Sequence, residues 1–248
     1  MSDTDVLYTS RDGIAEITLN RPEKYNVLTH DTVAQLRAAW ERFNASDEDR
    51  VAILSAAGDK AFTAGANLRD IPHDLWRAIP GVGIAVDKPI IAVTAGLVVG
   101  GGLVLVQFAD LAIAADNTVF SYPEAKVGFS GGLISSLAAR IPHKVAMELL
   151  LVGGRIDAQR AYEVGLVNRV APLGQQLDAA RELAAQIAVN APLVLKLLKG
   201  FVGQTLPKGP TETAAHARRE IEAINASADF HEGIAAFVDK RAPVFGGH

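Results

Sequence analysis

The sequence predicts an α/β protein with a largely parallel sheet and a helical C-terminal part. Short apolar runs at residues 51–55, 90–94 and 111–115 have the length of buried strands, and segments with helical periodicity alternate with such runs. The last third of the chain carries several helical patterns in succession. Because strands that alternate with helices are typical of βαβ units, we expect most of the strands to pair in parallel.

The first elements are a hairpin and an amphipathic helix. Residues 6–10 and 14–19 are β-branched runs on either side of Arg-Asp-Gly, and Asp-Gly is a strong signal for a tight turn between antiparallel strands. Thr29 is a candidate N-cap for the helix that follows. Apolar residues recur after it at three- and four-residue spacing, namely Val33, Leu36, Trp40 and Phe43.

From Ala158 onward the sequence reads as helical throughout. Helical patterns cover residues 173–189, 191–202 and 210–225, and prolines fall in the breaks between them. We expect residues 1–204 to form the α/β core and residues 205–248 to form a C-terminal helical segment, as parts of one functional unit.

Composition and charge argue against several classes of protein. The 248-residue chain is long enough for a sizeable core, and without cysteine it can form neither a disulfide nor a thiolate or iron–sulfur site. Its 24 basic and 28 acidic residues give a net charge of −4, which favours neither nucleic acid nor an anionic membrane as a partner. The acidic first residues and the shortness of the apolar runs predict a cytoplasmic protein.

Several common catalytic motifs are missing or out of context. The six histidines form no i,i+4 pair, so no metal site is predicted, and no dinucleotide fingerprint is present. Residues 128–132, Gly-Phe-Ser-Gly-Gly, match the turn that exposes a nucleophilic serine, here Ser130. A proline and charged residues precede this turn where a buried strand is required. We therefore prefer a chance match, with a serine hydrolase as the alternative.

Two glycine-rich loops and one carboxylate form a more informative set. Residues 60–68 and 96–102 each follow a strand-like run, and the second loop opens an apolar stretch that we expect to begin a buried helix. One N–H group from each loop could bind a single carbonyl oxygen and stabilise an enolate; alternatively, the glycines serve only tight turns. If Glu124 faces the same pocket, burial raises its pKa and suits it to proton transfer at carbon.

These segments together resemble the enoyl-CoA hydratase/isomerase family, also called the crotonase superfamily. The resemblance runs through nearly the whole chain. Its landmarks occur in the family's order at residues 17–24, 64–68, 96–102, 151–156, 165–168 and 229–241.

The resemblance implies an acyl-CoA thioester substrate, whose carbonyl oxygen is bound by the N–H groups of Ala66 and Gly101, and no cofactor beyond the CoA moiety. It also implies a ββα spiral core and a C-terminal part that packs against neighbouring subunits in a homotrimer or a dimer of trimers. The residues matched to CoA contacts are Lys24, Lys60, Ala64, Arg69 and Lys240, the last from the C-terminal part of this or a neighbouring subunit; solvated surface charge is the alternative for the basic ones. Those matched to the acyl pocket are Leu68, Val104, Phe129 and Gly132.

One position departs from the hydratases of the family, which use two glutamates twenty positions apart. Glu124 matches the second glutamate, and the first falls on Val104. Hydration is easiest when two carboxylates share the water, whereas one carboxylate can carry a proton from the α-carbon to the γ-carbon. We therefore expect isomerisation rather than hydration. Residues 121–126 and 140–144 also resemble the carnitinyl-CoA dehydratase branch, so a hydratase or dehydratase remains an alternative, as does a non-catalytic acyl-CoA-binding subunit.

Overall fold

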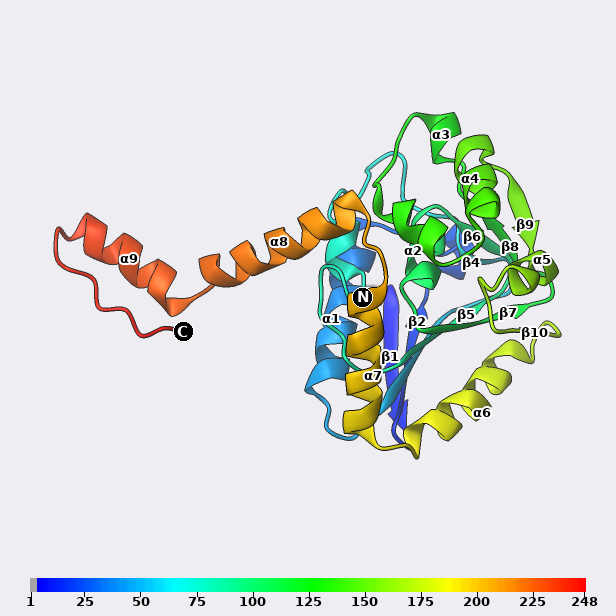
Figure 1. Cartoon of the computed structure of the whole chain (residues 1–248), viewed down its shortest axis with the longest axis horizontal. Helices are drawn as coiled ribbons and strands as arrows, with labels where there is room; N and C mark the ends of the chain where they lie inside the picture. Colours follow the sequence, from blue (N-terminus) through cyan, green and yellow to red (C-terminus); the bar gives the residue numbers. More distant parts are fainter. Residues whose placement is uncertain (1–3) are drawn as a thin grey trace.

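The structure, a computed structural model, describes residues 4–248 and contains two β-sheets flanked by helices (Figure 1). The first sheet has the strand order β1 (Val6–Arg11), β2 (Ile14–Leu19), β3 (Val51–Ala56), β5 (Ile90–Thr94), β7 (Leu111–Ala115) and β10 (Arg169–Ala171). The second has the order β4 (Ala61–Thr63), β6 (Leu97–Val99), β8 (Val119–Ser121) and β9 (Arg155–Asp157).

The α-helices are α1 (His30–Ala45), α2 (Gly101–Gln107), α3 (Glu124–Val127), α4 (His143–Val152), α5 (Ala158–Glu163), α6 (Gln176–Ala188), α7 (Pro192–Thr205), α8 (Pro210–Asn225) and α9 (Ala228–Val238). Shorter 3₁₀ helices are η1 (Pro22–Lys24), η2 (Leu75–Ala78) and η3 (Leu133–Ala139).

The predicted hairpin and first helix are confirmed. β1 and β2 pair antiparallel, and Asp12 and Gly13 between them have φ values of 53° and 77°, the left-handed backbone of a tight hairpin turn. Thr29 caps α1, since its Oγ1 accepts the N–H of Thr32 at 3.1 Å. The buried face of α1 includes the predicted residues Val33, Leu36, Trp40 and Phe43. Local sequence is therefore sufficient to specify both elements.

The chain alternates between the two sheets, and this alternation produces a ββα spiral. β3, β5 and β7 are parallel neighbours in the first sheet, and each is followed after a few residues by β4, β6 or β8 in the second. A helix then returns the chain to the first sheet, as α2 does after β6. The predicted α/β class with largely parallel strands is confirmed, and the ends of β4, β6 and β8 come side by side.

Both faces of the first sheet are buried at β3, β5 and β7, as expected from the mainly apolar sequences of these three strands. Ala52 and Leu54 of β3 belong to the main core, together with the buried face of α1. Val51 and Ile53, which point to the opposite face, pack against α6. The helix α6 thus covers the face that α1 leaves open.

β10 shows that the prediction of an all-helical last third was wrong. Its three residues pair in parallel with β7 at the edge of the first sheet. A strand this short has no detectable periodicity, so tertiary contacts decide its conformation. Asn168, just before β10, is one such contact. Its Oδ1 accepts the N–H of Ala112 at 2.8 Å, and its own N–H donates to Ala112 O at 2.7 Å.

α8 and α9 form an arm that extends away from the two sheets (Figure 1). The first turn of α8 packs against η3, and α7 runs beside the body of the molecule. Large apolar side chains are exposed along α7, α8 and α9, including Leu193, Leu197, Phe201, Ile224 and Phe237. Among residues 4–248, no single helix is long and apolar enough to cross a membrane; α6 and α7 meet that test only together, as a pair bent by 107°.

Candidate active site

The three residues predicted to act on the substrate follow strands of the second sheet, at one edge of that sheet. Ala66 follows β4, Gly101 follows β6 and Glu124 follows β8. β4 pairs in parallel with β6, and β6 pairs in parallel with β8, so the carboxyl ends of all three strands meet at that edge. The carboxyl edge of parallel strands is the common place for ligands in α/β proteins.

The N–H group of Ala66 points away from Leu28, the residue to which its loop is hydrogen-bonded. Ala66 forms a parallel bridge with Leu28, in which Leu28 N–H donates to Gly65 O and Asn67 N–H donates to Leu28 O, each at 2.9 Å. Successive N–H groups of an extended segment point to opposite sides, so that of Ala66 faces away from Leu28. Within residues 4–248 it has no hydrogen-bond acceptor, and it is available to a ligand.

Gly101 supplies a second N–H group of this kind. It is the first residue of α2, where N–H groups have no partner inside the helix and where the helix dipole places partial positive charge. Gly100 N–H donates to Ser121 O at 3.1 Å, which ties the start of α2 to the end of β8. All residues of α2 are buried, as the sequence predicts.

Gly65 allows the first loop to lie close to the second. Its φ is +92°, and a methyl group at its Cα would lie 3.1 Å from the carbonyl oxygen of Val99, the last residue of β6. Both features favour glycine, because a side chain would strain the backbone and push against β6. The position of Ala66 relative to β6 therefore depends on this glycine.

Glu124 begins α3 and is partly buried. A methyl group at Gly100 would lie 3.2 Å from Glu124 Oε1, so this oxygen faces the start of α2. Tyr122 donates its hydroxyl to Oε2. Burial raises the pKa of Glu124 above its usual range, and the hydrogen bond from Tyr122, followed by the nearby Gly131 backbone and Ser130 side chain, reduces this rise.

Val104 lies in the interior of α2, where its N–H donates to Gly100 O at 3.3 Å. Its side chain is 5% exposed and belongs to the main core. The position that the family resemblance matches to the first hydratase glutamate is therefore one helical turn from Gly100 and apolar.

The other predicted pocket residues lie in two loops, one after α3 and one after β4. Phe129 makes an edge-on contact with His73 at 6.1 Å between ring centroids, which brings the loop after Ala66 next to the loop after Glu124. Gly132 lies against Thr211 of α8. Leu68 is 60% exposed.

The residues predicted to contact CoA are more widely spread. Lys24 lies beside the β4 loop, because the residue after it accepts the N–H of Ala64 at 2.9 Å. Arg69 is exposed in the same loop, whereas Lys60 precedes β4 at the opposite end of that strand. Lys240 follows α9 on the extended arm, away from the other four in this chain (Figure 1).

The turn around Ser130 has a different environment from a nucleophile turn. It follows α3 rather than a strand, and across the described part of the chain no histidine hydrogen-bonds Ser130. Ser130 Oγ accepts the N–H of Gly132 at 3.1 Å and lies 3.3 Å from the Tyr122 hydroxyl. Sequence reasoning missed the contacts of the Tyr122 hydroxyl with Glu124 and Ser130. A hydroxyl two residues before a candidate base was the available signal.

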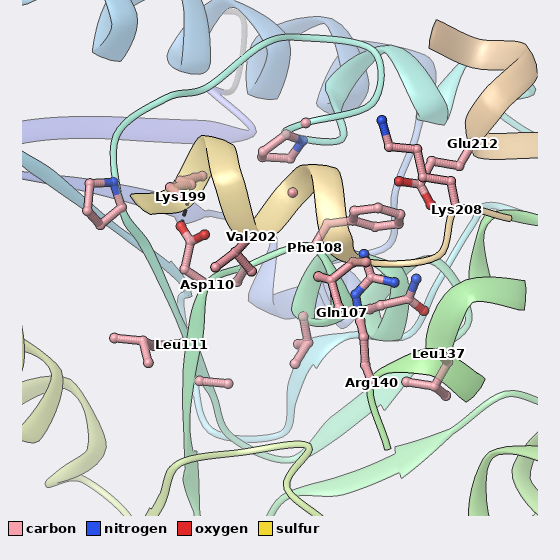
Figure 2. A pocket seen from close by; sticks show the side chains of 18 of the residues that line it. Gln107, Phe108, Asp110, Leu111, Leu137, Arg140, Lys199, Val202, Lys208 and Glu212 are labelled. Atoms are coloured by element: carbon pink, nitrogen blue, oxygen red, sulfur yellow. Dashed lines mark hydrogen bonds and ion pairs between the residues drawn. The ribbon is translucent and has the colours of Figure 1, made fainter. Parts of the chain in front are cut away.

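A separate cavity of about 690 Å³ lies beneath α7 (Figure 2). Gln107 at the end of α2, Arg140 after η3 and the ion pair of Lys199 with Asp110, 2.7 Å apart, line it. In the described chain, the predicted acyl-pocket residues and Glu124 are not part of its lining.

Comparison with known proteins identifies the family. The sequence model described as Enoyl-CoA hydratase/isomerase matches residues 9–248. The chain belongs to the enoyl-CoA hydratase/isomerase family. Relatives named carnitinyl-CoA dehydratase, from Citrobacter koseri and Escherichia coli K12, are 35% and 34% identical to it. Each alignment covers 98% of this chain and 99% of the relative.

Solved structures of the family have the same fold. A carnitinyl-CoA hydratase from Mycobacterium avium superposes with a TM-score of 0.78 at 31% identity, over 100% of both chains. A probable enoyl-CoA hydratase/isomerase from Mycobacterium abscessus superposes with a TM-score of 0.74 at 34% identity, over 99% of both chains. The predicted family and its crotonase fold are confirmed.

Proposed function

We propose that this enoyl-CoA hydratase/isomerase family enzyme moves the double bond of an enoyl-CoA thioester, with Glu124 as its acid–base group. One observation carries the proposal. Glu124 is a partly buried carboxylate at the edge where β4, β6 and β8 end, with one oxygen beside Gly100, while Val104 puts an apolar side chain where hydratases of the family use another carboxylate.

In this proposal the N–H groups of Ala66 and Gly101 bind the thioester oxygen. Both groups lack a partner in their own loops, and the N-terminus of α2 adds partial positive charge. Negative charge develops on the thioester oxygen when a proton leaves the α-carbon, so these donors stabilise the enolate more than the ground state. A single donor of this kind contributes about 3 kcal/mol to lowering the barrier in comparable sites.

Glu124 then carries one proton between two carbons. Its carboxylate removes a proton from the α-carbon of a β,γ-unsaturated thioester, and the electron pair spreads over the thioester oxygen and the former double bond. The carboxylic acid returns the proton to the γ-carbon, the double bond forms between the α- and β-carbons, and the carboxylate is regenerated. A pKa raised by burial suits Glu124 to both halves of this transfer.

Hydration or dehydration is the second candidate, since several relatives are named carnitinyl-CoA dehydratase. That reaction also passes through a thioester enolate, and Glu124 can supply or remove its α-proton. Water must then be placed without a carboxylate at position 104. The two candidates differ in their product, which is a 3-hydroxyacyl thioester for hydration and a shifted double bond for isomerisation.

Glu124→Gln tests the proposal. The amide keeps the shape of the side chain and one acceptor oxygen but cannot accept the substrate proton. We expect exchange of α- and γ-hydrogens in deuterated water, followed by NMR on a panel of enoyl-CoA esters, to fall by about 10² to 10⁴-fold. Calorimetry with a saturated acyl-CoA should show affinity within a few-fold of the unsubstituted enzyme.

Glu148→Gln is the matched control, because Glu148 is an exposed glutamate on α4. This variant should keep full activity. Undiminished exchange in Glu124→Gln would contradict the role of Glu124. An unsubstituted enzyme that binds the esters but shows no exchange would support the non-catalytic alternative, and labelling by a serine-directed phosphonate would support the hydrolase alternative.

We also propose that the protein assembles as a homotrimer or a dimer of trimers through its C-terminal helices. Phe237 is 85% exposed and Leu193 is 79% exposed in the isolated chain, and large exposed apolar surfaces of this kind mark association sites. The arm formed by α8 and α9 would then place Lys240 near a neighbouring subunit.

A further inference from the structure

The hydroxyl of Tyr122 binds one oxygen of Glu124 and leaves the other oxygen without this contact. Tyr122 directly follows β8 and is 4% exposed, so its ring is fixed in the core. Its hydroxyl donates to Glu124 Oε2 and lies 3.3 Å from Ser130 Oγ. Glu124 Oε1 instead lies beside Gly100, next to the N-terminus of α2.

We propose that Tyr122 is a positioning residue that holds Glu124 Oε2, so that Oε1 alone removes and returns the substrate proton. This inference rests on the proposed role of Glu124 as the acid–base group. Neither the chemistry of a carboxylate nor the fold requires the arrangement, since another side chain at position 122 could fill the core without binding Glu124.

Restricting Glu124 to one reactive oxygen has a physical consequence. The terminal torsion of a glutamate has a broad, roughly two-fold distribution, so an unrestrained carboxylate presents either oxygen at changing angles. A hydrogen bond from a buried hydroxyl to the charged group is among the stronger ones in proteins and selects one orientation. Oε1 is then held toward Gly100, on the side of the predicted oxyanion donor, during both proton transfers.

The same hydrogen bond opposes the effect of burial on the acidity of Glu124. Burial raises the pKa of Glu124, and the hydrogen bond from Tyr122 lowers it more than the nearby Gly131 and Ser130 do. Burial and the bond to Glu124 raise the pKa of Tyr122 itself, so its hydroxyl stays protonated and donates.

Charged side chains on the adjacent helices do not shift the pKa of Glu124 in the described residues. Lys126 of α3 donates to Gly153 O at 2.9 Å, and α4, which packs against α3, carries His143, Lys144 and Glu148. The hydrogen bond from Tyr122 is therefore the largest contribution that keeps the carboxylate ionised.

Tyr122→Phe tests the inference, because it removes one oxygen atom and keeps the buried ring. Glu124 must be ionised to accept a proton, so kcat/KM falls as pH drops through the pKa of Glu124 in the free enzyme. Loss of the hydrogen bond raises that pKa, and the acid side of the profile should move about one unit or more to higher pH. We expect kcat to fall about tenfold or more at high pH, with KM within twofold.

A second substitution tests the strength of the same hydrogen bond in the opposite direction. A fluorinated tyrosine placed at position 122 has a more acidic hydroxyl, which donates more strongly to the carboxylate. The acid side of the profile should then move to lower pH. Tyr162→Phe, at an exposed tyrosine on α5, is the matched control and should leave the profile unchanged.

The outcomes separate this inference from the proposed function. An inactive Glu124→Gln together with a Tyr122→Phe variant whose pH profile and kcat match those of the unsubstituted enzyme would overturn the positioning role alone. An active Glu124→Gln would overturn both. Because a folding defect could also lower kcat, the melting temperature of each variant is measured, and the pH shift rather than the rate decides.

Discussion

Gly65→Ala measures how closely the rate depends on the position of the Ala66 loop. Gly65 has φ +92°, and an added methyl group would lie 3.1 Å from Val99 O, a few tenths of an ångström inside ordinary contact. A non-glycine residue with left-handed backbone costs roughly 1–2 kcal/mol, which predicts a comparable loss of stability. Relief of the contact moves the loop away from β6, and with it the N–H of Ala66.

The rate should respond more than the stability does. Removing an oxyanion donor costs about 10² to 10³-fold in kcat, so partial displacement of the Ala66 N–H should cost about tenfold or more. Isomerase kcat and the free energy of unfolding in urea are the two measurements. Gly174→Ala is a close control, since Gly174 has φ +90° with no atom within 4 Å of the added methyl group.

Gly174→Ala should lose similar stability and keep its kcat. If both variants lost kcat equally, backbone strain alone would explain the effect, and the argument that Gly65 sets the position of Ala66 would be wrong. A Gly65→Ala variant with normal kcat would refute the argument directly.

Two further predictions concern the missing carboxylate and the arm. Val104→Glu should increase hydration of crotonyl-CoA, measured by loss of enoyl absorbance. It should also lower the free energy of unfolding by about 3 kcal/mol, because the new carboxylate is buried in the core. Unchanged hydration in a folded variant would show that position 104 does not limit water addition. Phe237→Glu should lower the molecular mass of the assembly in sedimentation equilibrium. The circular dichroism spectrum should not change, since Phe237 is 85% exposed in the single chain. An unchanged oligomer would exclude α9 from the interface.

The elements that the sequence predicted correctly are those specified by neighbouring residues. The Asp12-Gly13 turn and the Thr29 cap depend on contacts within a few positions, and both were predictable. β10 was not, because its pairing with β7 depends on contacts between Asn168 and Ala112. A strand of three residues at a sheet edge has too little local signal to compete with the helical patterns around it.

The candidate site divides in the same way. The loops at residues 60–68 and 96–102 were predictable from the strand-like runs before them, whereas the choice of Ala66 and Gly101 within them came from the family resemblance. The structure places β4, β6 and β8 side by side, and Ala66, Gly101 and Glu124 follow these strands. The contacts of the Tyr122 hydroxyl with Glu124 and Ser130 were not predictable. They require the loop after α3 to turn back toward Tyr122, which it does between Gly128 and Gly132, at φ values of 70° and 75°. No periodic pattern in the sequence predicts this turn of the loop.

The replacement of a glutamate by Val104 bears on the direction from which protons reach the substrate. A carboxylate on α2 and one after β8 would come from two different elements, as water addition needs when a proton and a hydroxyl go to adjacent carbons. With an apolar side chain on α2, proton transfer is left to the β8 side. The α- and γ-carbons of a planar dienolate both present that face, so a single oxygen can reach each in turn. In the proposed mechanism, the apolar residue at position 104 therefore hinders hydration and leaves isomerisation intact.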